Sequence, residues 1–174
     1  MALGRVAPVL QVVGYKNSGK TTAMAKFIEA GVRAHLRMAS IKHHGHGGKP
    51  EPAESQRDSE RHFQAGAAIS SVEGEGVLQM IARQEHWALE DILAIYQSFQ
   101  VDAVLVEGYK RAAYPKVVMV GKQEDVQLLG ELTNVCAVIK PTSVELESLN
   151  CPVFSREEEL DYQEWFLHYI KKEK

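Results

Sequence analysis

Near the start of the chain, glycines, a lysine and a threonine occur in a spacing that suits phosphate binding. Residues 14–21 follow the pattern G-x-x-x-x-G-K-T, and they come directly after a short apolar run from Pro8 to Val13. A buried strand that leads into a tight turn and then a helix aims several backbone N–H groups at one point, beside the positive end of the helix. Because such a turn binds polyphosphate, we expect a nucleotide here.

Each residue type in this loop has a chemical role. Gly14 and Gly19 allow backbone conformations that a Cβ atom would block. Lys20 is expected to reach the outer phosphates, and the hydroxyl of Thr21 is expected to bind Mg²⁺. The alternative is a glycine-rich turn between a strand and a helix, with a solvated lysine.

An acidic residue on a later apolar strand is expected to complete the magnesium site. The segment from Val101 to Gly108 carries two acids, Asp102 and Glu107, which lie about 16 Å apart along an extended strand. Ligands of open parallel sheets bind beyond the carboxyl ends of the strands, so Glu107 and not Asp102 is the candidate metal and catalytic residue. The alternative is a carboxylate that caps a helix or forms an ion pair.

Two further segments carry groups that could contact anions. Lys42, His43, His44 and His46 belong to a segment rich in histidine and glycine that follows an expected strand. We expect this segment to contact anionic oxygens. A transition-metal site built from the imidazoles and a solvated loop are the alternatives.

The second such segment follows Glu107 at once. Lys110 and Arg111 would give a second anion two cations, although a solvated basic turn is the alternative. Asp58 could contact Mg²⁺ or an attacking water, or could cap a helix together with Ser59.

The composition narrows the class of protein. With 174 residues, we expect one nucleotide-binding domain over residues 1–174. A net charge of -3 argues against nucleic acid as a partner, and no apolar run approaches membrane-spanning length. Two scattered cysteines fit a reducing compartment, so we expect a cytoplasmic protein that does not enter a membrane.

The elements that must position these residues follow from periodicity. A strand, a helix and a second strand of these lengths imply parallel pairing, and therefore an α/β fold with three layers: a mostly parallel sheet, helices on both faces and a possible antiparallel hairpin. The final helix is expected to begin after Ser155 and to turn Leu160 inward. The expected helices are Thr22–Val32, a short one ending near Gly66, Trp87–Phe99 and one reaching about Lys171. Besides the strands at Pro8 to Val13 and Val101 to Gly108, the expected strands are Leu36–Lys42, Ala67–Val72, Val77–Ala82, Pro115–Val120, Val135–Ile139 and Pro152–Phe154.

Several of these motifs together resemble the molybdopterin-guanine dinucleotide biosynthesis protein B family (MobB), a family of P-loop GTP-binding proteins. The resemblance covers the chain up to about Val120. After a late strand the family commonly has Thr-Asp, whereas this chain has Lys140 and Pro141, so no base-reading motif is carried over to that loop. The resemblance rests on the loop Gly14–Thr22, on Ile41-Lys42-His43-His44-Gly45-His46, on Asp58-Ser59 with Ala65-Gly66-Ala67, and on Val106-Glu107-Gly108-Tyr109-Lys110.

The resemblance implies a weak GTPase that uses GTP and Mg²⁺ and forms a homodimer. It implies an accessory role beside the molybdenum cofactor guanylyltransferase that attaches GMP to molybdopterin, with molybdopterin or molybdopterin guanine dinucleotide as the second ligand. The alternative function is a small-molecule kinase or ligase that uses the same phosphate loop. The candidate ligand-binding residues are Gly14, Asn17, Ser18, Gly19, Lys20, Thr21, Thr22, Lys42, His43, His44 and Lys110.

Overall fold

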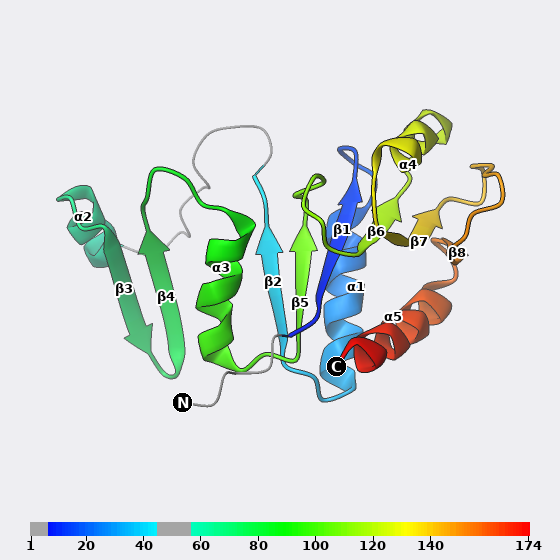
Figure 1. The fold of residues 1–174 in the computed structure, drawn as a ribbon. Helices are drawn as coiled ribbons and strands as arrows, with labels where there is room; N and C mark the ends of the chain where they lie inside the picture. Colours follow the sequence, from blue (N-terminus) through cyan, green and yellow to red (C-terminus); the bar gives the residue numbers. More distant parts are fainter. Residues whose placement is uncertain (1–6, 45–56) are drawn as a thin grey trace.

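A parallel sheet of six strands forms the centre of the computed structural model, which describes residues 7–44 and 57–174 and, of residues 57–60, the backbone alone (Figure 1). The strand order is β2-β5-β1-β6-β7-β8, and every neighbouring pair runs parallel. The strands are β1 (Val9–Gly14), β2 (Met38–Lys42), β5 (Ala103–Glu107), β6 (Lys116–Met119), β7 (Val135–Lys140) and β8 (Val153–Ser155).

Helices cover both faces of this sheet. On one face, α1 (Lys20–Arg33) and α5 (Glu159–Glu173) pack on the largest core cluster, in which Phe27 and Phe166 are fully buried. On the other face lie α3 (Leu89–Tyr96) and the short α4 (Leu128–Glu131). The expected three-layer α/β fold is therefore confirmed.

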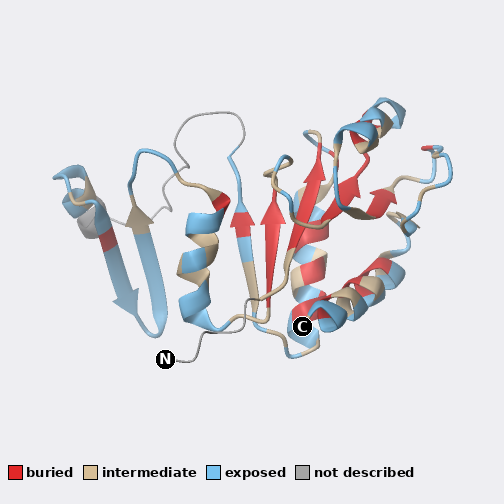
Figure 2. Ribbon diagram, in the orientation of Figure 1, coloured by how far each residue is buried: buried red, intermediate tan, exposed pale blue. Residues whose placement is uncertain are grey.

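The central strands are buried on both faces, as Figure 2 shows in red for β1 and β5. Along β1, Leu10 and Val12 face the cluster with α1 and α5, whereas Val13 packs in the cluster on the opposite face. This two-sided burial explains why the strands read as continuous apolar runs rather than as alternating patterns.

The predicted hairpin is present as a separate antiparallel sheet of two strands, β3 (Ile69–Gly74) and β4 (Val77–Ala82). It follows α2 (Arg57–Gln64) and lies beside α3, beyond the β2 edge of the main sheet (Figure 1). The first strand begins and ends two residues later than expected, because the turn is confined to Glu75 and Gly76, which both have positive φ.

The structure corrects the expected end of the chain. Ser155 belongs to β8, and its backbone N–H is bonded to the carboxylate of Glu158 at 2.7 Å, so the helix begins only at Glu159. Leu160 is 78% exposed, and the expectation that it faces inward is wrong. The buried side chains of α5 instead include Tyr162, Phe166 and Ile170, spaced four residues apart on one face.

Other boundaries differ from expectation by a turn or less. The helix expected from Trp87 to Phe99 is α3 followed by a short 3₁₀ turn, Gln97–Phe99, and Phe99 is 45% exposed. The segment after β6, for which the sequence predicted neither a helix nor a strand, forms a 3₁₀ turn (Gln123–Gln127) that leads into α4. Among the helices in the described ranges, none is both long and apolar enough to span a membrane.

Candidate functional site

The loop between β1 and α1 has the conformation that its glycines were expected to provide. Gly19 has a φ of 89°, in the left-handed region, and Asn17 has a φ of 61°. At Gly14, a Cβ atom would lie 2.5 Å from both the carbonyl oxygen of Met119 and the hydroxyl oxygen of Ser18, so no larger side chain fits without a shift. The loop is therefore folded tightly at the start of α1, as phosphate binding requires.

Lys20, the first residue of α1, folds over this loop. Its Nζ atom donates a hydrogen bond to the carbonyl oxygen of Tyr15 at 2.6 Å. Burial lowers the pKa of Lys20 from its usual value; Glu107 opposes this effect, whereas Lys110 and Lys42 add to it. A partly desolvated ammonium surrounded by other cations is well placed to bind an anion.

Thr21 and Glu107 meet where β1 and β5 end. The hydroxyl of Thr21 donates to the carboxylate of Glu107, with distances of 3.2 and 3.3 Å to the two oxygens. Glu107 is 8% exposed, and Lys42 of β2 lies 3.5 Å from one of its oxygens. The β2–β5 register places Lys42 directly beside Glu107, so β2 and β5 end, and α1 begins, at the same edge of the sheet.

An open cleft of about 960 Å³ lies over this edge. Its charged lining is strongly cationic, because five Lys or Arg side chains (Lys16, Lys20, Lys42, Lys110 and Arg111) accompany the single carboxylate of Glu107 among the described residues. This excess of positive charge in the cleft contrasts with the net charge of -3 of the whole chain. The cleft is lined by Gly14, Tyr15, Lys16, Asn17, Lys20, Thr21, Lys42, His43, His44, Glu107, Gly108, Tyr109, Lys110, Arg111 and Ala112.

Aromatic contacts connect the loops around the cleft. The rings of His43 and Tyr109 have centroids 4.3 Å apart, which joins the segment after β2 to the segment after β5. The Nζ atom of Lys110 lies 4.4 Å from the ring centroid of Tyr15, a cation–π contact with the phosphate loop. The two cationic segments predicted from the sequence are thus brought together beside the phosphate loop.

Three of the predicted loop residues do not line the cleft. Ser18 is 1% exposed and its hydroxyl has no hydrogen-bond partner among the described residues, whereas Thr22 is exposed in the first turn of α1. Gly19 contributes its conformation. Asp58 lies in α2, but its side chain is outside the described part of the structure, as is the whole of His46.

Asp102 lies at the other end of β5, as expected. It accepts hydrogen bonds from the backbone N–H of Arg37 at 2.8 Å and from the Nζ atom of Lys174 at 2.5 Å. The bond from the Arg37 backbone, followed by the bond from Lys174, lowers the pKa of this carboxyl group. Asp102 therefore has a structural role far from the cleft.

Sequence reasoning missed the residues that support the site from below. Arg156, after β8, donates to the carbonyl oxygens of Ser18 at 2.7 Å and Val120 at 3.0 Å, and so holds the back of the phosphate loop. Nothing in the sequence marked this arginine. Gln11 of β1, whose amide nitrogen donates to the carbonyl oxygens of Gly108 and Tyr109, could have been found, because it is the one polar residue in the apolar run from Val9 to Val13.

The histidines do not form a metal centre with their described neighbours. In the part of the chain that the structure describes, no three His, Cys, Asp or Glu side chains lie close enough together to hold a metal ion. His43 and His44 therefore lack a third ligand of this kind among those residues. An oxygen site for Mg²⁺ at Thr21 and Glu107 does not need such a group, because phosphate and water complete the coordination of this ion.

The fold and the loop geometry define a P-loop α/β protein of the nucleotide-binding class. Comparison with known proteins narrows this class. Residues 9–141 match the family described as Molybdopterin guanine dinucleotide synthesis protein B, and the chain belongs to this family, MobB.

Two curated relatives carry related names. A probable molybdopterin-guanine dinucleotide biosynthesis adapter protein of Bacillus subtilis (strain 168) is 39% identical over 154 residues, which cover 88% of each chain. The molybdopterin-guanine dinucleotide biosynthesis adapter protein of Haemophilus influenzae is 31% identical and is matched over 94% of this chain and 91% of its own length.

Solved structures of the same family share the fold. A MobB protein homolog from Bacillus stearothermophilus is 40% identical, with a TM-score of 0.77 over 94% of this chain and 98% of the homolog. Bacillus subtilis MobB is 37% identical, with a TM-score of 0.80 over 92% and 96% of the two chains.

Proposed function

We propose that this protein is a GTP-binding accessory protein of molybdenum cofactor biosynthesis, which assists the guanylyltransferase that forms molybdopterin guanine dinucleotide. The names of the curated relatives support the pathway, since both names describe an adapter protein of molybdopterin-guanine dinucleotide biosynthesis. The cleft supports the ligands, because it joins a phosphate loop to further cations in one open space. We also propose that residues 1–174 act as one cytoplasmic domain.

The observation that carries this proposal is the contact between Thr21 and Glu107. A hydroxyl and a buried carboxylate at 3.2 and 3.3 Å, next to a phosphate loop, form the oxygen donor set that suits Mg²⁺. Magnesium bound there would neutralise charge on the phosphates of GTP. This chain's own contribution is to present the hydroxyl of Thr21, the carboxylate of Glu107 and the ammonium of Lys20 from rigid element ends.

The second ligand we propose is molybdopterin or molybdopterin guanine dinucleotide. Lys42, His43, His44 and Lys110 line the side of the cleft formed by the segments after β2 and β5, whereas the phosphate loop forms the other side. A phosphate or pyrophosphate group on this side would find donors separate from those that hold GTP. The ring contact between His43 and Tyr109 fixes these two segments relative to each other.

We propose that turnover of GTP is slow. Glu107 and Asp58 are the candidate catalytic groups, but Glu107 is already engaged by Thr21 and Lys42. A kinase would need a free general base beside its acceptor. Among the described residues that line the cleft, Glu107 is the single carboxylate, which favours an accessory GTPase over the kinase or ligase alternative.

The guanylyltransferase is the proposed partner, and the protein is proposed to act as a homodimer. The hairpin supports self-association, because its strands expose large apolar side chains. Ile69 is 62% exposed, Val77 61% and Leu78 50%. Sedimentation of the wild type beside an Ile69→Lys, Leu78→Lys variant tests this, because a dimer formed through the hairpin would dissociate in the variant.

The nucleotide proposal is tested by measuring GTP hydrolysis with and without candidate phosphate acceptors. An accessory GTPase releases inorganic phosphate slowly and at a rate that acceptors do not change. Transfer of the γ-phosphate to an added small molecule would instead establish the kinase alternative.

A further inference from the structure

The connection between β5 and β6 is unusually short for parallel strands. β5 ends at Glu107 and β6 begins at Lys116, so residues 108–115 alone carry the chain across β1. The crossing stays near the cleft edge of the sheet, because Gln11 of β1 pairs with both Val106 and Lys116. Parallel crossovers usually need about a dozen residues or more and commonly contain a helix. This crossover contains neither a helix nor a strand, and it passes over β1, which lies between β5 and β6 (Figure 1).

Such a crossover has a shortage of hydrogen-bond donors. A backbone N–H of β1 reaches one of its carbonyl groups, that of Pro115, and a buried carbonyl without a partner is costly. Two buried side chains from the strands beneath supply the donors. Gln11 of β1 and Lys116 of β6 are both 0% exposed, and they stand opposite each other in the β1–β6 register.

Gln11 holds the first part of the crossover. Its amide nitrogen donates to the carbonyl oxygens of Gly108 at 2.9 Å and Tyr109 at 2.7 Å. Both of these residues have positive φ, 97° and 50°, and a Cβ atom at Gly108 would lie 3.0 Å from the Cβ of His43. The chain therefore makes a strained, tight bend at this point, which the glutamine stabilises.

Lys116 holds the second part. Its Nζ atom donates to the carbonyl oxygens of Ala112 at 2.5 Å and Tyr114 at 2.8 Å. No carboxylate of the described residues lies within ion-pair distance of this lysine, and burial lowers its pKa. A fully buried lysine is rare, and here its donors go to the backbone of one short crossover.

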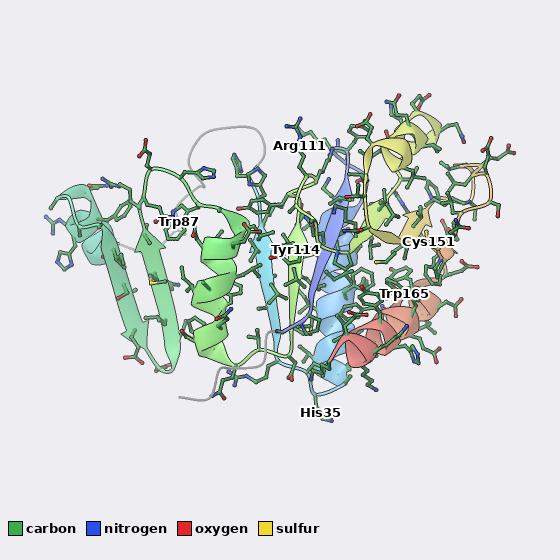
Figure 3. The ribbon with its side chains drawn as sticks, in the orientation of Figure 1. His35, Trp87, Arg111, Tyr114, Cys151 and Trp165 are labelled. Atoms are coloured by element: carbon green, nitrogen blue, oxygen red, sulfur yellow. The ribbon has the colours of Figure 1, made fainter. Side chains whose placement is uncertain are left out.

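Between these two anchored parts lie the cations of the cleft, Lys110 and Arg111. Figure 3 shows Arg111 at the cleft end of the crossover and Tyr114 further down over the sheet. We propose that Gln11 and Lys116 are positioning residues that fix the crossover, and through it Lys110 and Arg111, in the geometry that receives the second anion. This proposal rests on the proposed function, which places that anion beside GTP.

Shape-matched substitutions test the proposal in the full chain. Gln11→Met and Lys116→Met keep the length of each side chain but remove its donors. Pyrophosphate, added while Mg²⁺·GTP saturates the phosphate loop, is expected to bind about tenfold more weakly to either variant, as the loss of one or two such hydrogen bonds predicts. The affinity for Mg²⁺·GTP is expected to change less than about threefold, because Lys20, Thr21 and Glu107 keep their contacts.

The matched control is Gln163→Met. Gln163 is also a buried glutamine with two side-chain hydrogen bonds, to Arg33 and Glu159, but it lies in α5 on the other face of the sheet. This variant is expected to lose stability without losing pyrophosphate affinity. A general loss of stability is thereby separated from displacement of the crossover.

Amide hydrogen exchange provides a second readout that needs no ligand. The backbone N–H of Gly108 donates a hydrogen bond to the carbonyl oxygen of Val12, and the N–H of Ala112 donates to the carbonyl oxygen of Tyr109. Both amides are expected to exchange faster in Gln11→Met and Lys116→Met than in Gln163→Met, when rates are compared at equal global stability.

The outcomes separate this inference from the proposed function. If the wild type binds no pyrophosphate beside Mg²⁺·GTP, the second-anion part of the proposed function fails, and the exchange of Gly108 and Ala112 alone decides whether the two residues hold the crossover. Unchanged exchange and unchanged pyrophosphate affinity in both variants would overturn the inference. So would an equal loss of Mg²⁺·GTP and pyrophosphate affinity, because the two residues would then support the whole cleft.

Discussion

The hydroxyl of Thr21 donates to the carboxylate of Glu107 across 86 residues of sequence, at 3.2 and 3.3 Å from its two oxygens. This contact fixes the end of β5 against the start of α1, because each side chain stands at the end of a rigid element. It also identifies which of the two acids near β5 belongs to the site. Asp102, at the far end, is bound instead to Arg37 and Lys174.

Replacement of Lys20 by alanine should remove most of the nucleotide affinity. A charge-assisted hydrogen bond to phosphate contributes about 1.5 to 3 kcal/mol, so GTP should bind roughly 10- to 150-fold more weakly. Calorimetric titration measures the effect, and Lys122→Ala is the charge-matched control because that side chain is 72% exposed and lines no part of the cleft. A folded Lys20→Ala protein with wild-type affinity would show that GTP binds elsewhere.

Replacement of Glu107 by glutamine should weaken Mg²⁺-dependent binding and turnover more than Mg²⁺-free GTP binding. The amide keeps the shape of the side chain but lacks the negative charge that the metal ion requires. Asp102→Asn should leave nucleotide binding unchanged and lower stability, since it weakens the contacts with Arg37 and Lys174. If Asp102→Asn weakened Mg²⁺-dependent binding and Glu107→Gln did not, the magnesium ion would lie at the Asp102 end of β5 instead.

Replacement of His43, His44 and Lys110 by alanine together should abolish binding of molybdopterin or its guanine dinucleotide while Mg²⁺·GTP affinity stays near normal. The three side chains line the cleft, but in the described part of the structure none of them forms a hydrogen bond or an ion pair with the side chain of Thr21 or Glu107. The control replaces two exposed histidines and a lysine elsewhere, His86, His168 and Lys171, by alanine. Parallel loss of GTP affinity would assign the three residues to the nucleotide site, and stoichiometric Zn²⁺ lost in the variant would establish a metal site instead.

Alkaline pH should destabilise the protein through the partly buried thiol of Cys136. Burial raises the pKa of Cys136 from 9.0 to about 12, so the folded state keeps the proton where the unfolded state releases it. Stability is therefore unaffected below about pH 8 and falls as the pH rises through about 9 towards about 12. Urea unfolding at several pH values should show a shallower loss in Cys136→Ala.

Tyr169 contributes to the same decline. Its pKa is raised from 10.0 to about 12, first by burial and then by Cys136, so the variant should retain a part of the alkaline loss. An identical pH dependence in the wild type and in Cys136→Ala would mean that the thiol ionises equally in both states.

The sequence predicted the elements that end at the cleft better than those that support it. Glycine spacing, strand length and the position of Glu107 within an apolar run were enough to place the phosphate loop and its acid, because each rests on a local rule. The contact of Arg156 with Ser18, by contrast, depends on where β8 joins the sheet, which no local pattern shows.

The same distinction explains why the sequence predicted the wrong orientation for Leu160 and no role for Lys116. Leu160 fits an apolar helical pattern, but it lies two residues before Tyr162, about 200° around the helix from the buried side chains, and so faces solvent. A lysine in a strand reads as a solvated residue. Only the helix-free crossover above it, which is a property of the topology, makes its burial favourable.

Calorimetric titration of the wild-type protein with GTP and ATP, each with and without Mg²⁺, is the decisive test of a GTP site at Lys20, Thr21 and Glu107. We expect one GTP per chain, tighter binding of GTP than of ATP, and an increase in affinity with Mg²⁺ that disappears in Glu107→Gln. Absence of GTP binding, or GTP affinity that neither Mg²⁺ nor Glu107 affects, would contradict it.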